Sequence, residues 1–436
     1  MSATGEFRLK RKLRIAINAQ IPSGSGTGGI ETVLRVLTAL GRLDGDEEYV
    51  FIGHWSEADW LQPLLSERQT IVRAPNPKPP HKPNRTETLK RLMGPLRPLA
   101  RSVKGFIAPP PPKIKISVPT SDGFYENLNC DVIHFPYQDY VHCRVPTVYN
   151  PHDLQHLHYP EFFAPEEIER REIVYPTACR AAQTVVVASQ FIKQDVTQRY
   201  GTAADKIQVI PWSPPETVLN EFTEKDVSSL FEKYECPHGS FILYPAMTWE
   251  HKNHIRLLEA VALLREREGL RVNVVCTGHK NAFYPRIEQR LHELKLEEQV
   301  KFTGVVTTKE LSLLYRRAQF VIVPTLFEAA SAPLFEAWQH GVAVACSSIT
   351  SLPEQAAGAA LFFDPFSIEE IANAIKMMAS DETLRAEFRS RGFKRLQNFD
   401  IERTAKAYRA VYRRAAGVVL SDEDRHLLNW DWMRDS

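Results

Sequence analysis

FVIVPTLFEAASAPLFEAWQHGVAVACS, residues 320–347, is the stretch of this sequence that predicts the fold. It opens with an apolar run, 320–323, that is rich in β-branched residues and too short for a helix, which predicts a buried strand. After a loop of small residues, Pro333 suits the first turn of a helix over 334–340. Residues 342–346 predict the next strand. Strand, loop, helix and strand in this order form the unit of a parallel α/β sheet.

Two glutamates lie in this stretch, eight positions apart. Glu328 follows the strand at its carboxyl end, where α/β sheets bind ligands, and Glu336 lies in the helix, close enough to face the same crevice. The backbone N–H groups of 331–334 form a helix N-terminus that can receive a phosphate. Together these groups suit a ligand with a sugar and a diphosphate. A chance pair of solvated glutamates is the alternative, and the residues alone leave both open.

The segment resembles the E-x7-E signature of retaining glycosyltransferases of family 4, which have the GT-B fold. The resemblance implies that Glu328 holds hydroxyls of the transferred sugar and that Glu336 holds the nucleotide ribose. It also places Ser331 and Ala332 at the donor site. The loop of the family usually reads E-G-F-G-L-P, whereas this chain reads E-A-A-S-A-P over residues 328–333, without the glycines.

The beginning of the chain predicts a second phosphate-binding element. Residues 13–18 predict a strand, PSGSGTGG at 22–29 is a glycine-rich loop, and 30–40 has helical periodicity. A flexible turn is the alternative, because a single glycine loop is weak evidence. Gly28 and Gly29 resemble the G-G-x-E of family 4, in which the glycines let the backbone approach the donor phosphates.

Three histidines follow a predicted strand, at positions 152, 156 and 158. A metal site is disfavoured because no fourth ligand lies nearby and structural zinc needs four. The segment resembles the N-P-H-D-L-Q-H loop of bacterial mannosyltransferase-like members of family 4. This implies that His152 lies beside the donor sugar and contributes a hydrogen bond near its 6-hydroxyl. Asp153 is expected to order the loop.

Lys252 precedes a predicted helix, where a cation conflicts with the helix dipole unless an anion binds there. An exposed lysine is the alternative. Family 4 carries a phosphate-binding lysine at the matching position, so the resemblance implies this role for Lys252. The usual partner arginine of the family is absent, since Ala246 and Met247 stand in its place.

Residues 74–120 depart from the pattern of a compact sheet domain. Two proline-rich patches flank 85–107, which has a rough helical period and six basic residues against one acid. Such a stretch suits an anionic bilayer surface or a lipid-linked substrate. A helical insertion packed on its own domain is the alternative.

Composition bounds the class of protein. The 436 residues predict two or three domains, and the formal net charge of +1 argues against nucleic acid as the main partner. The six cysteines form no C-x-x-C pair, which favours reduced thiols. The absence of an apolar run of membrane-spanning length predicts a cytoplasmic protein, at most peripheral at the inner face of the cell membrane. The two D-x-D strings, 44–46 and 422–424, are expected to be solvated.

The sequence therefore predicts an α/β protein of the GT-B fold, in which two Rossmann-like, doubly wound domains face each other across a cleft. The predicted organisation is an acceptor-side domain (1–215, with the insertion 74–120), a linker (216–237), a nucleotide-sugar-binding domain (238–398), a helix crossing back to the first domain (399–416) and a tail (417–436).

The predicted activity is that of a retaining, metal-independent glycosyltransferase of polysaccharide biosynthesis. No cofactor is expected; the donor is GDP-mannose or a UDP-sugar, and the acceptor is a glycan or a lipid-linked glycan. Glu328, His152 and Lys252 are the expected catalytic residues. Two other functions stay open: a nucleotide-sugar 2-epimerase on the same scaffold, and a non-catalytic protein of glycosyltransferase type.

Overall fold

The computed structural model describes residues 12–21, 28–76, 116–214, 222–236 and 239–434. The basic stretch 85–107 and residues 22–27 of the glycine-rich loop lie outside the described residues, so the membrane-surface prediction stays a prediction.

The first sheet has seven strands, in the order β3-β2-β1-β4-β5-β6-β7, and all of its pairs are parallel. Strand β1 lies inside the sheet, where Ile15 pairs with Tyr49 on one side and Val132 on the other. Residues 15–19 of this strand are all buried, without alternation, because helices cover both faces of a parallel sheet. Its strands are β1 (Arg14–Ala19), β2 (Glu48–Gly53), β3 (Gln69–Arg73), β4 (Val132–Phe135), β5 (Thr147–Tyr149), β6 (Thr184–Val187) and β7 (Ile207–Val209), and its helices are α1 (Gly28–Ala39), α3 (Phe124–Asn127), α4 (Gln155–His158), α5 (Pro165–Ala181) and α6 (Gln190–Tyr200).

The second sheet has six parallel strands, in the order β10-β9-β8-β11-β12-β13. The stretch 320–347 lies at its centre, with β11 between β8 and β12, and Pro333 in the first turn of α11 as predicted. The strands are β8 (Ile242–Pro245), β9 (Val274–Thr277), β10 (Val300–Gly304), β11 (Phe320–Val323), β12 (Ala343–Ser347) and β13 (Leu361–Phe363). The helices are α7 (Glu224–Tyr234), α8 (His254–Glu268), α9 (Tyr284–Glu293), α10 (Thr308–Arg317), α11 (Ala332–Gln339), α12 (Leu352–Ala356), α13 (Ile368–Ser380) and α14 (Glu382–Leu396).

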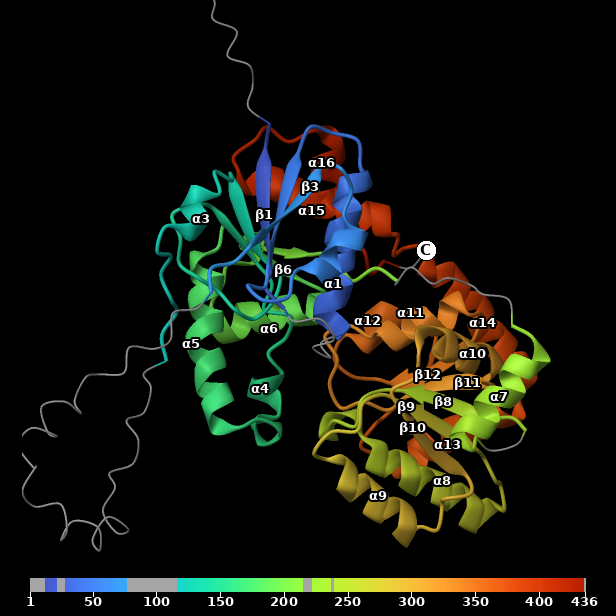
Figure 1. Cartoon of the computed structure of the whole chain (residues 1–436). Coiled ribbons are helices and arrows are strands. Elements are labelled where there is room, and N and C mark those ends of the chain that lie inside the picture. Colours follow the sequence, from blue (N-terminus) through green and yellow to red (C-terminus); the bar gives the residue numbers. More distant parts are fainter. Residues whose placement is uncertain (1–11, 22–27, 77–115, 215–221, 237–238, 435–436) are drawn as a thin grey trace, which may run out of the picture.

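The chain then returns to the first domain through α15 (Ile401–Ala415) and α16 (Asp422–Leu428), drawn in red beside the blue strands in Figure 1. Tyr408 and Tyr412 on α15 are bound from the first sheet: the Asn150 amide donates to the Tyr408 hydroxyl (3.1 Å), and His134 Nδ1 lies 2.8 Å from the Tyr412 hydroxyl. The predicted architecture, two Rossmann-like domains and a helix that crosses back, is confirmed.

The tail after residue 416 is structured, although its sequence pattern predicts no element there. Trp432 is buried in the same hydrophobic core as β1 and α15. Asp424 is also buried, and both of its carboxylate oxygens lie 3.1 Å from the Arg413 guanidinium. The expectation that Asp424 is solvated is therefore wrong. A buried carboxylate needs such a partner, and its D-x-D string belongs to a helix start that Ser421 caps.

Several local predictions differ from the structure. Helix α1 begins at Gly28, two residues before the predicted start, so Gly28 and Gly29 form its first turn. The edge strand β3 was not predicted, because its residues mix polar and apolar types. His152 has a φ of 64° and precedes α4, so it does not share a helical face with His156. Helix α7 lies within the segment predicted as a linker, 216–237.

Candidate active site

A cavity of about 700 Å³ lies between the two domains. Its walls come from the α1 helix and the segment after β7 on one side, and from the loops at the carboxyl ends of β8, β9 and β11 on the other. The lining includes Arg35, Thr38, Arg42 and Trp212 from the first domain, and Ala246, Met247, Lys252, Gly278, Glu328, Ala330, Ala332, Pro333 and Glu336 from the second. The crevice at the strand ends of an α/β sheet is where such folds bind ligands.

Lys252 and Glu328 form an ion pair in this cavity. Lys252 Nζ lies 2.5 Å from Glu328 Oε1, and the two side chains are only 19% and 12% exposed. Burial raises the pKa of Glu328, the Lys252 ammonium opposes that rise, and the Asp153 carboxylate of the first domain adds to it. The pair therefore sets a carboxylate that accepts hydroxyl hydrogens directly beside a cation that attracts phosphate.

The backbone around Lys252 is held by its neighbours. The Tyr244 hydroxyl donates to the Lys252 carbonyl (2.6 Å), and the Asn253 amide donates to the carbonyls of Pro324 and Pro365 (both 2.9 Å). Asn253 has a φ of 63°, a left-handed conformation that asparagine tolerates better than most residues. This kink lets α8 begin at His254 while Lys252 points to the cavity.

Glu336 lines the same cavity from α11. It accepts a short hydrogen bond from the Tyr315 hydroxyl of α10. Burial raises the pKa of Glu336, and this hydrogen bond partly opposes the rise. A half-buried carboxylate with one oxygen engaged keeps its other oxygen for a hydroxyl pair of a ligand.

The N-terminus of α11 supplies fewer free donors than the sequence suggested. The Ser331 N–H already donates to Gln355 Oε1 (2.8 Å), and Pro333 has no N–H. No side chain caps this helix, so the Ala332 and Leu334 N–H groups are the remaining donors of its first turn. Ser331 itself is buried beneath the loop, and its hydroxyl has no hydrogen-bond partner among the described residues.

His152 is buried outside the cavity lining. Its Nε2 lies 2.8 Å from the Pro136 carbonyl, which places the proton on Nε2 and leaves Nδ1 as an acceptor. Burial lowers the pKa of His152, which keeps the ring neutral. The ring lies 6.4 Å from that of Trp212, which does line the cavity. Asp153 orders the loop as expected, because its carboxylate accepts the Gln155 N–H (3.0 Å).

Sequence reasoning missed the contribution of α1 to this cavity. Arg35 and Thr38 line it from one face of α1, three positions apart, and Arg42 lines it from the 3-10 turn (Leu40–Arg42) that follows. Arg35 is exposed and makes no ion pair within the described part of the chain. The signal was present as a polar stripe that interrupts the apolar positions of the predicted helix. These arginines line the same cavity as Ala246 and Met247, which stand where the family arginine is absent.

Gly278 shapes the floor of the cavity. Its φ is 117°, and a Cβ there would lie 2.7 Å from the Ala246 backbone. Only glycine lets the loops after β8 and β9 approach this closely.

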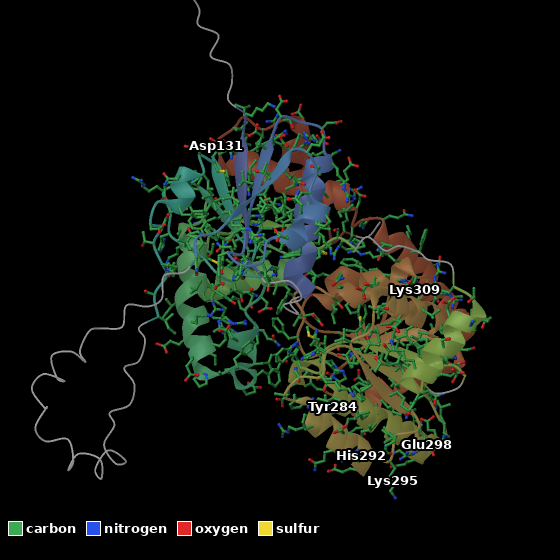
Figure 2. The ribbon with its side chains drawn as sticks, viewed as in Figure 1. Asp131, Tyr284, His292, Lys295, Glu298 and Lys309 are labelled. Carbon is green, nitrogen blue, oxygen red and sulfur yellow. The ribbon has the colours of Figure 1, made fainter. Side chains whose placement is uncertain are left out.

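The outer surface of the second domain is unlike the cavity. The polar side chains of His292, Lys295 and Glu298 project from the edge of this domain that lies away from the first (Figure 2). Among the described residues, no cluster of three histidine, cysteine, aspartate or glutamate side chains could hold a metal ion. No helix in the described ranges is long and apolar enough to cross a bilayer.

Comparisons with known proteins define the class. Residues 27–212 match the model of Glycosyltransferase Family 4, and residues 205–395 match that of Glycosyl transferases group 1. In structure the chain is similar to Anabaena Alr3699/HepE, solved in complex with UDP and glucose, with a TM-score of 0.64 and 17% identity over 92% of this chain and all of that one. The fold is therefore that of GT-B glycosyltransferases.

The chain is also similar in sequence to two mannosyltransferases. O-antigen chain mannosyltransferase B of Escherichia coli is 25% identical over 63% of this chain and 75% of its own length. The serotype-specific mannosyltransferase WbdA of Escherichia coli is 25% identical over 65% of this chain, which spans 34% of that longer protein. The chain belongs to glycosyltransferase family 4, and it is a glycosyltransferase.

Proposed function

We propose that this protein is a retaining, metal-independent hexosyltransferase that moves mannose from GDP-mannose to a glycan or lipid-linked glycan. The observation that carries this proposal is the Lys252–Glu328 ion pair, which shares one interdomain cavity with Glu336 and the start of α11. A sugar, a diphosphate and a ribose each meet suitable groups along this wall.

Each residue has a role that follows from its chemistry. Glu328 accepts hydrogen bonds from the sugar hydroxyls, and Glu336 accepts those of the ribose. Lys252 and the Ala332 N–H meet the diphosphate, which gains negative charge as it leaves. His152 would accept a hydroxyl hydrogen through Nδ1 if the loop moves its ring to the donor sugar.

The reaction proceeds on one face of the sugar. The bond from the anomeric carbon to the diphosphate oxygen breaks, and the acceptor oxygen bonds to the same carbon from the same side. The acceptor proton passes to the departing phosphate oxygen, so no second carboxylate is needed as acid or base. Because Lys252 and a helix N-terminus offset the charge, we expect transfer to continue in EDTA.

The donor is chosen on similarity, and a direct experiment tests it. Two relatives are mannosyltransferases by name, while Alr3699/HepE was solved with UDP and glucose, so a GDP-sugar and a UDP-sugar are the competing donors. Calorimetry with GDP and UDP, followed by product analysis with GDP-mannose and UDP-glucose, separates them. Binding of neither nucleotide would overturn the proposal. Transfer to an acceptor that vanishes in Glu328→Ala would exclude both an epimerase and a non-catalytic role.

We also propose that residues 85–107 attach the protein to an anionic membrane surface, where a lipid-linked acceptor would be found. The support is their six basic residues against one acid. Sedimentation with anionic liposomes should weaken with added salt and be lost on deletion of 85–107. Sedimentation that survives the deletion would reject this attachment.

A further inference from the structure

The loop that carries Glu328 is built partly into the opposite domain. Phe327, the preceding residue, is 3% exposed and packs in the hydrophobic core of the first domain, as does Ala329 on the other side. The Phe327 ring lies 5.3 Å from that of His158 and 6.1 Å from that of Phe191. The side chains on either side of Glu328 therefore enter one domain, while Glu328 itself pairs with Lys252 of the other.

The backbone of Glu328 is held by the start of α12. The Glu328 N–H donates to Thr350 Oγ1 (3.2 Å), and the Glu328 carbonyl accepts from Ser351 Oγ (2.8 Å). Gln355 binds both the N–H and the carbonyl of Ser331 (both 2.8 Å). Residues 350–355 thus brace both ends of the short segment between Glu328 and α11.

This brace is itself attached to the first domain. The Glu354 carboxylate accepts the N–H groups of Gln190 and Phe191, both at 3.0 Å. These are the first residues of α6, where a carboxylate satisfies unpaired N–H groups and meets the positive end of the helix. Phe191 therefore contacts both supports: its N–H binds Glu354, and its ring packs against Phe327.

We infer that Phe327 and Glu354 are positioning residues through which the start of α6 sets the place of Glu328, so that sugar transfer depends on the two domains being seated together. This inference rests on the proposed function. It predicts an effect on the rate of transfer and little effect on nucleotide affinity, because Lys252 and Glu336 are anchored within the second domain. A displacement of about 1 Å at a reacting group can lower a rate by about 100-fold.

The test compares Phe327→Ala, Phe327→Leu and Glu354→Gln with Phe162→Leu. Phe162 also contacts the opposite domain, through a ring distance of 6.4 Å to His251, and it reaches the Phe327 ring through its stacked neighbour Tyr159 rather than directly. We expect kcat for transfer to fall about 10- to 100-fold in Phe327→Ala and Glu354→Gln. Phe327→Leu, which keeps most of the apolar volume, should be intermediate. The Kd for the nucleoside diphosphate, measured by calorimetry, should change by less than about threefold.

Amide hydrogen exchange supplies a readout that needs no catalysis. The Glu328 and Ser331 N–H groups, which are bonded to the brace, should exchange faster in Phe327→Ala and Glu354→Gln than in Phe162→Leu. Unchanged exchange, or a lower melting temperature with wild-type kcat, would overturn the inference and leave these contacts as simple interface packing. A wild-type protein that transfers no sugar would instead reject the proposed function, and the exchange result would still decide the positioning role.

Discussion

The two walls of the interdomain cavity are built differently. On the wall of the second domain, each charged group already has a partner: Lys252 pairs with Glu328, and Glu336 with Tyr315. On the wall of the first domain, Arg35 projects from α1 without an ion pair within the described residues. The wall of the second domain is therefore preorganised, which favours electrostatic stabilisation of a transition state. The wall of the first domain carries an exposed cation, Arg35, that can follow a bound substrate.

The largest expected effect is that of Glu328→Gln. The neutral amide keeps the size of the side chain but loses its charge and half of its acceptor capacity, so we expect transfer to fall by about 100- to 1,000-fold. Initial rates measure this, with Glu298→Gln on the outer surface as the control. A rate within about threefold of wild type would show that the preorganised wall is not where the chemistry occurs.

Lys252→Ala is expected to come next. Loss of a charged hydrogen bond to the diphosphate should weaken nucleotide binding by about 2 kcal/mol, or about 30-fold in Kd. Calorimetry with the nucleoside diphosphate checks this. Lys309→Ala is the matched control, since Lys309 pairs with Asp226 outside the cavity. Equal affinities in the two variants would remove the diphosphate from this wall.

Arg35→Ala should have a smaller effect. An exposed cation contributes about 1 kcal/mol or less, so KM for the donor or the acceptor should rise by about fivefold at most, and the effect should shrink as salt is added. Steady-state kinetics at low and high ionic strength measures it. A loss as large as that of Lys252→Ala, unaffected by salt, would contradict the distinction between the two walls.

Glu336→Gln is expected to give the smallest effect, on stability. Because burial raises the pKa of Glu336, the folded state binds its proton more tightly than the unfolded state. The free energy of unfolding therefore falls as the pH rises from the pKa of this carboxyl in the unfolded chain through its raised pKa in the folded protein. The variant lacks this loss, so its melting temperature at pH 7 should be about 1–2 °C higher, and the gain should vanish below about pH 4. Calorimetric melts at both pH values check this, and a lower melting temperature at pH 7 would refute it.

The sequence alone predicts the part of the site that lies within one continuous stretch, from β11 to β12. The apolar run 320–323, Pro333 and the following strand placed Glu328 and Glu336 correctly relative to β11 and α11, because strand, loop and helix are neighbours in sequence. Lys252 lies beside Glu328 because the two residues follow β8 and β11, which are adjacent strands in the sheet.

Other parts depend on partners that no local pattern identifies. Nothing near Phe327 indicates that its ring belongs to the core of the other domain, and nothing near Glu354 indicates that it binds the start of α6. The same holds for Trp432, for which the tail sequence indicates no partner and which is 1% exposed. These contacts join positions that are far apart in the chain, so they become visible only when the domains are folded together.

The return of α15 and α16 to the first sheet also fixes the order in which this protein can be completed during its synthesis. The hydrophobic core around Ile15 and Leu34 is completed by side chains of α15 and the tail, namely Tyr408, Val411, Tyr412 and Trp432. The half that leaves the ribosome first therefore holds an open apolar face until the last described residues are made. A shortened gene that stops after residue 398 would release that half unfinished, and it should be recovered mainly as aggregate.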